Sequence, residues 1–259
     1  MKTKIHPTAI VDPKAEIDSS VEIGPFCIVK SKVKIRKGSK MLSHVIVEDS
    51  TEIGENCIIH PYTSLGFPPQ DLKYKGEDTK VIIGDNNTIR EYVSIHRASV
   101  GGDGTTVIGN NNFFMAYVHI AHDCKIGNNV IMANAATLAG HVLIEDYAVI
   151  GGLAAIHQYT RIGRYAMVGG FSGIGQDIPP YMIASGARAR LYGPNTIGLK
   201  RHGLSDATIN AIKKAYKILF REKRTLKDAI KKVRNEMSGI EEVDHLINFI
   251  EKNKRGICR

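Results

Sequence analysis

Apolar residues recur every six positions through most of this chain. The residue after each is often Gly or Ala, and the fifth residue of each unit is small or β-branched. A helix needs apolar residues at a spacing of about 3.6 and a regular strand at about 2, so neither explains this pattern. A period of six predicts a solenoid, a parallel β-helix with one short strand per unit. The repeated positions in the middle of the chain are Ile108, Phe114, Ile120, Ile126, Met132, Leu138, Ile144, Ile150, Ile156, Ile162, Val168 and Ile174.

The same period extends toward the N-terminus with two interruptions. It runs from Ile5 to Leu65, returns in phase at Ile83, and resumes after a second break at Ile108. The stretches 66–80 and 101–107 are rich in Gly, Pro or Asp, which indicates loops outside the solenoid. We therefore expect a solenoid domain over 1–180, and a linker with a C-terminal helical domain over 181–259.

The region after residue 180 shows helical patterns. Ser205-Asp206 is a typical N-cap, and apolar residues follow it at helical spacing. Thr225 and Asp228 resemble a capping box with Asp in place of Glu, and a last helix is predicted over 243–249. These helices are expected to cover the end of the solenoid, which would otherwise expose unpaired strand edges. The predicted fold class is an all-β hexapeptide-repeat solenoid with a small C-terminal α-helical domain.

The net charge of +9 is concentrated near the C-terminus. Residues 196–259 carry 16 Lys and Arg against 8 Asp and Glu, so the rest of the chain is close to neutral. Such a basic region predicts an anionic partner. No nucleic-acid-binding motif or interleaved aromatic residues accompany it, so no nucleic acid is expected. An acidic carrier protein or a nucleotide diphosphate fits better.

The cysteine positions and the hydropathy of the chain indicate which metal sites and which cellular compartment to expect. Cys27, Cys57 and Cys124 occupy the fifth position of their units and are expected to point inward, whereas Cys258 is expected to be a free thiol. The absence of a C-x-x-C spacing argues against a cysteine zinc site. No run is long and apolar enough for an integral membrane segment, and the early start of the repeat leaves no room for a signal peptide. We therefore expect a cytoplasmic protein.

Several histidines are predicted to share one face of the solenoid. Three six-residue units make one coil, so His122, His141 and His157 fall in units that stack on successive coils. With the second loop excluded, His96 falls on the same face one coil earlier. A strand spacing of about 4.8 Å then predicts a ladder of four histidines, with His119 at the corner leading into that face.

Three interpretations of this cluster remain open from the residues alone. An imidazole can act as a general base toward a hydroxyl nucleophile, with Asp123 fixing its tautomer. Three histidines can instead hold zinc with an open water position, as in carbonic-anhydrase-like chemistry. The cluster can also belong to a trimeric scaffold or binding surface without catalysis. Hexapeptide solenoids host both of the first two chemistries, so the fold alone does not choose between them.

Specific motifs carry a family resemblance over nearly the whole chain. The chain resembles the UDP-N-acetylglucosamine O-acyltransferases of lipid A biosynthesis. The motifs that carry the resemblance are Gln70-Asp71-Leu72-Lys73, Ile95-His96-Arg97, His119-Ile120-Ala121-His122-Asp123-Cys124, Thr137-Leu138-Ala139-Gly140-His141, Ile156-His157-Gln158 and Gln176-Asp177-Ile178-Pro179-Pro180.

This resemblance implies a left-handed β-helix that forms a homotrimer with active sites in the clefts between subunits. The implied reaction transfers a 3-hydroxyacyl group from acyl carrier protein to the glucosamine 3-hydroxyl of UDP-N-acetylglucosamine, without a metal or another cofactor. A 3-amino UDP-sugar acceptor stays open as an alternative.

The resemblance also implies roles for individual residues. His122 would be the general base, Asp123 its orienting partner and Gly140 the oxyanion donor through its backbone N–H. The expected substrate-binding residues are Gln70, Asp71, Lys73, His96, His119, His141, Gly152, His157, Gln158, Asn195 and Arg201, and the expected acyl-pocket residues are Met167, Gly170 and Arg188. Two positions depart from the usual family pattern: His202 replaces an Arg, and Arg188 stands where His is common. With Gly170 facing the distal end of the acyl chain, a long chain is favoured.

Overall fold

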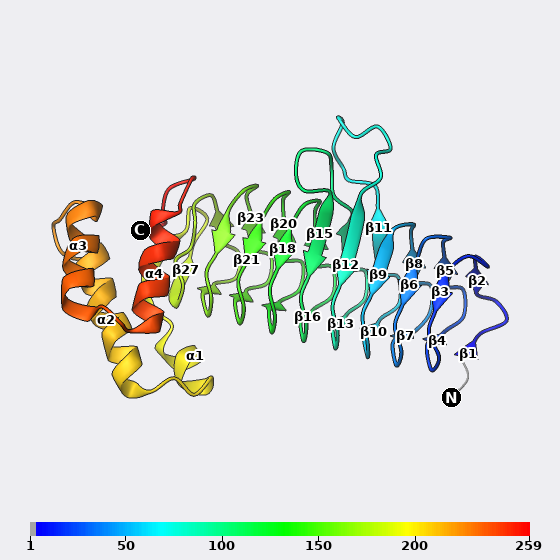
Figure 1. The fold of residues 1–259 in the computed structure, drawn as a ribbon, viewed down its shortest axis with the longest axis horizontal. Coiled ribbons are helices and arrows are strands. Elements are labelled where there is room, and N and C mark those ends of the chain that lie inside the picture. Colours follow the sequence, from blue (N-terminus) through cyan, green and yellow to red (C-terminus); the bar gives the residue numbers. More distant parts are fainter. Residues whose placement is uncertain (1–3) are drawn as a thin grey trace.

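The computed structural model describes residues 4–259, so residues 1–3 at the start of the predicted solenoid domain lie outside the described part. Figure 1 shows a long prism of short strands with helices at one end. Three sheets form the sides of the prism, and successive strands move from one sheet to the next. The predicted fold class, a left-handed parallel β-helix with C-terminal helices, is confirmed.

Each sheet takes every third strand of the solenoid, and all pairs are parallel except β27 with β28. Sheet I contains β1 (Lys4–Ile5), β4 (Glu22–Ile23), β7 (Lys40–Met41), β10 (Ile58–Ile59), β13 (Thr88–Ile89), β16 (Phe113–Phe114), β19 (Ile131–Met132), β22 (Val149–Ile150), β25 (Met167–Val168), β27 (Met182–Ser185) and β28 (Arg190–Pro194). Sheet II contains β2 (Ile10–Val11), β5 (Ile28–Val29), β8 (Ile46–Val47), β11 (Ser64–Phe67), β14 (Ser94–His96), β17 (His119–Ile120), β20 (Thr137–Leu138), β23 (Ala155–Ile156) and β26 (Gly173–Ile174). Sheet III contains β3 (Glu16–Ile17), β6 (Lys34–Ile35), β9 (Thr51–Ile53), β12 (Lys80–Ile83), β15 (Thr105–Ile108), β18 (Lys125–Ile126), β21 (Leu143–Ile144) and β24 (Arg161–Ile162).

The apolar repeat forms the core of the prism. Ile120 pairs in register with Ile95 on one side and Leu138 on the other, and all three side chains are fully buried. Burying an aliphatic side chain of this size contributes roughly 1.5–3 kcal/mol, and the prism repeats this gain at every coil. Cys57 and Cys124 are buried at fifth positions, as the sequence predicted.

The corners between sheets require left-handed backbone conformations. Asp123 (φ 60°) and His141 (φ 61°) occupy such a corner between sheets II and III. The same conformation recurs at many other corners, including Tyr117 and Asn129, so it belongs to the fold and is not special to these two residues. It costs a non-glycine residue roughly 1–2 kcal/mol. Backbone bonds between coils, such as His141 N–H to the His122 carbonyl at 3.0 Å, hold the corners in place.

Two excursions leave the prism between sheets II and III, and both are visible as loops beside β11, β12 and β15 in Figure 1. The first covers residues 68–79, between β11 and β12, and the second covers 97–104, between β14 and β15. The sequence placed the second loop at 101–107. Its last residues are instead in β15, because Thr105–Val107 pair in register with Lys80–Ile82 of β12.

The C-terminal region contains α1 (Thr196–Arg201), α2 (Asp206–Phe220), α3 (Leu226–Met237) and α4 (Glu241–Glu251). Both predicted N-caps form: the Ser205 and Thr225 side chains accept hydrogen bonds from Thr208 N and Asp228 N. The segment that the sequence left as a linker contains β27 and β28, which continue sheet I. In the described part of the chain, no helix is long and apolar enough to span a membrane.

The helical region is fixed to the end of the solenoid by polar contacts. Arg161 of β24 pairs with the buried Asp177 at 2.7 Å and donates to the Phe249 carbonyl of α4 at 2.8 Å. Nε2 of His245 lies 2.8 Å from a carboxylate oxygen of Glu145. These contacts place α4 against the last coils, where strand edges would otherwise be exposed.

Candidate active site

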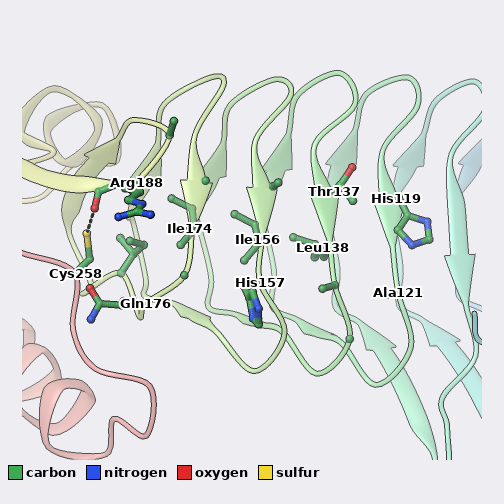
Figure 2. A pocket seen from close by; sticks show the side chains of 18 of the residues that line it. His119, Ala121, Thr137, Leu138, Ile156, His157, Ile174, Gln176, Arg188 and Cys258 are labelled. Atoms are coloured by element: carbon green, nitrogen blue, oxygen red, sulfur yellow. Dashed lines mark hydrogen bonds between the residues drawn. The ribbon is translucent and has the colours of Figure 1, made fainter. Parts of the chain in front are cut away.

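A groove with a volume of about 880 Å³ runs along the outer side of sheet II. Figure 2 shows its length, from His119 at one end to Arg188, Gln176 and Cys258 at the other. Its walls come mainly from β17, β20, β23 and β26, with the segment 187–189 closing the far side. Seven predicted site residues line it, namely Gln70, His96, His119, His122, Gly140, His157 and Arg188.

His122 and Asp123 form a hydrogen-bonded pair at the edge of the groove. Nδ1 of His122 lies 2.8 Å from Oδ2 of Asp123. The carboxylate is almost fully buried, whereas the imidazole keeps some exposure toward the groove. An ionised carboxylate can only accept, so it selects the tautomer with the proton on Nδ1 and leaves Nε2 with a free lone pair.

The second excursion holds Asp123 in place. Oδ2 of Asp123 also accepts hydrogen bonds from Ser99 N at 2.9 Å and from Ser99 Oγ at 2.8 Å. The Asp123 N–H donates to Oγ1 of Thr106 at 2.8 Å. Gly102 lies so close to the carboxylate that a Cβ there would collide with it. The loop therefore supports the His122–Asp123 pair through these contacts.

Gly140 lies directly against the His122 ring. A Cβ built on Gly140 would stand 2.5 Å from Cε1 and 2.7 Å from Nε2 of His122, so only glycine fits. No acceptor among the described residues takes a hydrogen bond from the Gly140 N–H. A free amide beside the base has the position expected of an oxyanion donor.

The first excursion and β14 organise a second pair of histidines. Nδ1 of His96 lies 2.7 Å from the Pro68 carbonyl and therefore donates to it. Nδ1 of His119 lies 2.8 Å from Oγ of Ser94. Burial lowers the pKa of His96, and burial with the nearby His96 and His122 lowers the pKa of His119 to about 4. Both rings are thus neutral near pH 7 and act as hydrogen-bonding groups.

The predicted ladder of four histidines is wrong in its arrangement. Side chains at the same position of stacked six-residue units form a row along the prism, and the four histidines do not share one position. His96 and His157 stand one position after the buried apolar residue of their units, whereas His122 stands two positions after it and His141 three. The four rings therefore belong to three neighbouring rows. The contacts are two edge-on pairs, His96 with His119 and His122 with His141, each with ring centroids 5.2 Å apart. His119 lies on strand β17 and not at the corner.

Other predicted site residues stand on a different side of the prism. Met167 lies on β25 of sheet I, and Gly152 and Gly170 pack together at the corner between sheets I and II. Asn195 caps α1, which follows β28 of sheet I, and Arg201 ends that helix. None of the five lines the groove of this chain.

The remaining predicted residues lie close to the groove without lining it. His141 stands behind His122, with Nε2 at 3.8 Å from Oδ2 of Asp123, and burial lowers its pKa. Gln158 follows His157 and accepts from it through its carbonyl at 3.3 Å. Asp71 and Lys73 follow Gln70 in the first excursion, where Asp71 accepts from the Lys73 N–H at 3.0 Å.

Comparison with known proteins identifies the family. The chain is 68% identical over 256 residues to the acyl-[acyl-carrier-protein]–UDP-N-acetylglucosamine O-acyltransferase of Thermodesulfovibrio yellowstonii, covering 99% of both chains. It is 48% identical to the enzyme of the same name from Syntrophobacter fumaroxidans, with 99% of this chain and 100% of the relative covered. The structure of LpxA from Acinetobacter baumannii superposes with a TM-score of 0.95 at 45% identity, covering 98% of this chain and 99% of that one.

The chain belongs to the UDP-N-acetylglucosamine O-acyltransferase family. Residues 177–258 match the family model described as UDP N-acetylglucosamine O-acyltransferase, domain 2, and residues 105–140 match the bacterial transferase hexapeptide repeat. The chain is therefore an acyltransferase, and the resemblance inferred from its motifs is confirmed.

In this acyltransferase the residues that complete the site carried no sequence signal of their own. Ser99 and Thr106 lie in or beside a predicted loop, where no period indicates which side chain turns inward. Ser94 precedes an ordinary repeat position, and Cys258 was expected only as a free thiol in the tail. Each was missed because its role depends on packing between coils that are distant in sequence.

Among residues 4–259, His122, Asp123 and His141 form a group that could hold a metal ion, with their ligand atoms within 4.8 Å of one another. In this arrangement Asp123 already receives two hydrogen bonds from Ser99, and Nδ1 of His122 is directed at the carboxylate. A metal bound there would have to replace the hydrogen bond that orients His122. The geometry thus favours a base–carboxylate pair.

Proposed function

We propose that this acyltransferase transfers a 3-hydroxyacyl group from acyl carrier protein to the 3-hydroxyl of UDP-N-acetylglucosamine, in the first step of lipid A biosynthesis. The names of the closely similar relatives support these two substrates. The observation that carries the chemistry is the His122–Asp123 pair beside Gly140 at the edge of a long groove. We expect the enzyme to act in the cytoplasm.

The reaction needs only a base, an oxyanion donor and two aligned substrates, because a thioester is already activated. Nε2 of His122 takes the proton of the sugar hydroxyl, whose oxygen attacks the thioester carbonyl. The Gly140 N–H stabilises the oxygen anion of the tetrahedral intermediate. The C–S bond then breaks, and His122 returns the proton to the thiolate of the departing carrier. Asp123 keeps its charge and stabilises the imidazolium between the two steps.

A second copy of the chain is needed to complete this site. Met167, Gly170 and Asn195 belong to sheet I or follow it, whereas His122 lies beyond sheet II. Residues on two sides of one triangular prism face away from each other. We propose a homotrimer in which sheet I of one subunit faces sheet II of the next. Met167, Gly170 and Asn195 of one subunit then meet His122 of its neighbour in a cleft.

The corner between sheets I and II would then point toward the three-fold axis. This corner carries a row of stacked aromatic residues: Tyr62 with Tyr92 at 5.0 Å and Tyr92 with Tyr117 at 4.8 Å between ring centroids. The three side chains are about half exposed in the single chain. Contiguous exposed aromatic surface of this kind is typical of a subunit contact.

The donor is expected to dock on the basic C-terminal region. Lys213 and Lys217 lie exposed on α2, and residues 196–259 hold most of the net positive charge. An acidic carrier protein would be attracted to this surface and steered toward the groove.

The deciding experiment is mass spectrometry of the product made from UDP-N-acetylglucosamine and a mixed pool of acyl carrier proteins. An O-acylated UDP-sugar that still forms after treatment with a chelator supports the proposal. Loss of activity on chelation, with restoration by zinc, would favour a metal site at His122, Asp123 and His141. If the enzyme acylates only a 3-amino UDP-sugar, that sugar is the acceptor and UDP-N-acetylglucosamine is not. If it acylates neither sugar, the histidine cluster belongs to a scaffold without catalysis.

A further inference from the structure

His122, Asp123 and His141 bring three metal-ligating atoms together within the part of the chain that the structure describes. Nδ1 of His122 lies 2.8 Å from Oδ2 of Asp123, and Nε2 of His141 lies 3.8 Å from the same oxygen. All three atoms lie within 4.8 Å of one another. In a tetrahedral zinc site the ligand atoms are about 3.4 Å apart, so a modest adjustment of the two rings would form such a site.

Two polar groups of this cluster have no hydrogen-bond partner among residues 4–259. Nε2 of His141 is too far from the Asp123 carboxylate for a hydrogen bond, and the ring makes none elsewhere. Oδ1 of Asp123 is buried and also has no partner. A buried carboxylate whose charge is only partly compensated favours a bound cation, and an imidazole with a free lone pair is a common metal ligand.

The surroundings hold His141 in place and add negative charge. The His141 ring stacks on Tyr159 with ring centroids 4.5 Å apart, and its backbone N–H donates to the His122 carbonyl at 3.0 Å. The carboxylates of Asp71 and Asp103, one from each excursion, lie close enough to stabilise positive charge at this ring. A divalent cation therefore meets a positioned ligand and a favourable electrostatic field.

A metal on Nδ1 of His122 would remove the base that the mechanism needs. In the structure the Nδ1–H donates to Asp123, so Nε2 has the free lone pair. A neutral imidazole that binds a metal through Nδ1 carries its single proton on Nε2. The proton thus moves from Nδ1 to Nε2 with no change in the charge of the ring, and Nε2 can no longer accept the proton of the sugar hydroxyl.

We propose that Zn²⁺ binds between His122, Asp123 and His141 and inhibits the enzyme. Two imidazoles and one carboxylate, with a fourth position open to water, form a ligand set typical of zinc. The metal replaces the proton between His122 and Asp123, and the two bonds from Ser99 still hold the carboxylate. Inhibition rests on the proposed function, since it requires His122 to be the base, whereas zinc binding does not.

Binding and inhibition are measured separately on the full-length enzyme, after a chelator has been added and removed. Calorimetric titration with ZnCl₂ should give one strong site per subunit, and the rate of acyl transfer should fall in proportion to its occupancy. Co²⁺ in the same site should show the visible absorption of a four-coordinate ion. Mg²⁺ should neither bind there nor inhibit, because it prefers six oxygen ligands. Renewed chelation should restore the rate.

Two histidine variants distinguish this site from zinc bound elsewhere. His141→Asn removes one ligand at a corner with a φ of 61°, which asparagine tolerates, and should weaken zinc binding at least about tenfold. His157→Asn is the matched control, because His157 lines the groove outside the cluster, and its zinc affinity should equal that of the wild type. The inhibition of each variant is compared with its own rate without zinc.

Each part of the proposal can fail separately. A wild-type enzyme that binds no zinc, or a His141→Asn enzyme that binds it as tightly as the wild type, would overturn the site. Zinc that binds there and leaves the rate unchanged would overturn the inhibition and the assignment of His122 as the base. A chelated enzyme that gains activity with zinc would replace the inhibitory metal by a catalytic one. An enzyme that acylates neither sugar but binds zinc through His141 would refute the proposed function and confirm the metal site alone.

Discussion

Nδ1 of His122 lies 2.8 Å from Oδ2 of Asp123, and the same carboxylate oxygen is held by Ser99 of the second excursion. The carboxylate that orients the His122 imidazole is therefore held by a loop that lies outside the six-residue repeat. The other edge of the ring lies against Gly140, where a side chain would collide with it. The first two predictions test these contacts of His122 and Asp123.

Removing the base should stop the chemistry while the fold stays intact. We expect His122→Ala to lower kcat by about 10²- to 10⁴-fold, the usual contribution of a general base. The thermal unfolding midpoint should change little, since His122 is at a corner and outside the apolar core. His157→Ala is the matched control and should act mainly on KM. A His122→Ala enzyme with more than about a tenth of the wild-type kcat would contradict the assignment.

The second prediction concerns the tautomer of His122. Asp123→Asn keeps the size of the side chain but removes its charge, so the proton is no longer held on Nδ1 of His122. We expect kcat to fall more than KM rises. Ser99→Ala should cause a smaller loss, because it removes one of several hydrogen bonds to the charged carboxylate, worth roughly 1.5–3 kcal/mol. Equal and small effects of both substitutions on kcat would argue against an orienting role for Asp123.

A site shared between subunits should show complementation. His122→Ala and Asn195→Ala homotrimers should each be weak, because each lacks one half of every site. Mixed trimers from co-expression should regain part of the wild-type rate, since some of their sites combine two intact halves. Recovery would be measured as kcat per trimer after purification through two different tags. Mixed trimers no more active than the parents would place all essential groups in one chain.

His119 should remain neutral far below the ordinary range of histidine. Burial and the nearby His96 and His122 lower its pKa to about 4. The unfolded chain binds this proton near pH 6.5, so the stability that His119 contributes is present above that pH and is lost as pH falls toward 4. NMR of ring-labelled histidine should show one resonance that titrates near 4 and disappears in His119→Asn. A midpoint above 6 would show that the ring is not desolvated.

Charge reversal on α2 should weaken binding of the donor selectively. Lys213→Glu with Lys217→Glu should raise KM for the acyl carrier protein far more than KM for the sugar nucleotide. The effect should shrink with added salt, because exposed charges are screened over about 8 Å at physiological ionic strength. Lys30→Glu, at another exposed lysine near the other end of the prism, serves as the control. Similar effects of both changes on both substrates would refute docking at α2.

The sequence by itself determined the repeat. One position of every six-residue unit points into the core of the prism, and because each coil has the same geometry, this position is apolar throughout. Ile120, Leu138 and Ile156 follow each other in register as that period requires. Capping chemistry is equally local, so Ser205 and Thr225 could be placed at helix starts. The motifs that carried the family resemblance, among them Gln70-Asp71-Leu72-Lys73 and the stretch from His119 to Cys124, are each contiguous in the sequence, so the sequence was sufficient for the family.

Tertiary structure decided how the decorating residues meet. A side chain that moves by one position within a six-residue unit projects from the prism in a different direction. The period alone therefore could not distinguish a single row of four histidines from the two pairs His96–His119 and His122–His141. The support of Asp123 by Ser99 and the contact of Cys258 with the Ala189 carbonyl join segments distant in sequence. Such contacts depend on where an irregular loop and the last residues of the chain fold back, and no periodic pattern encodes that.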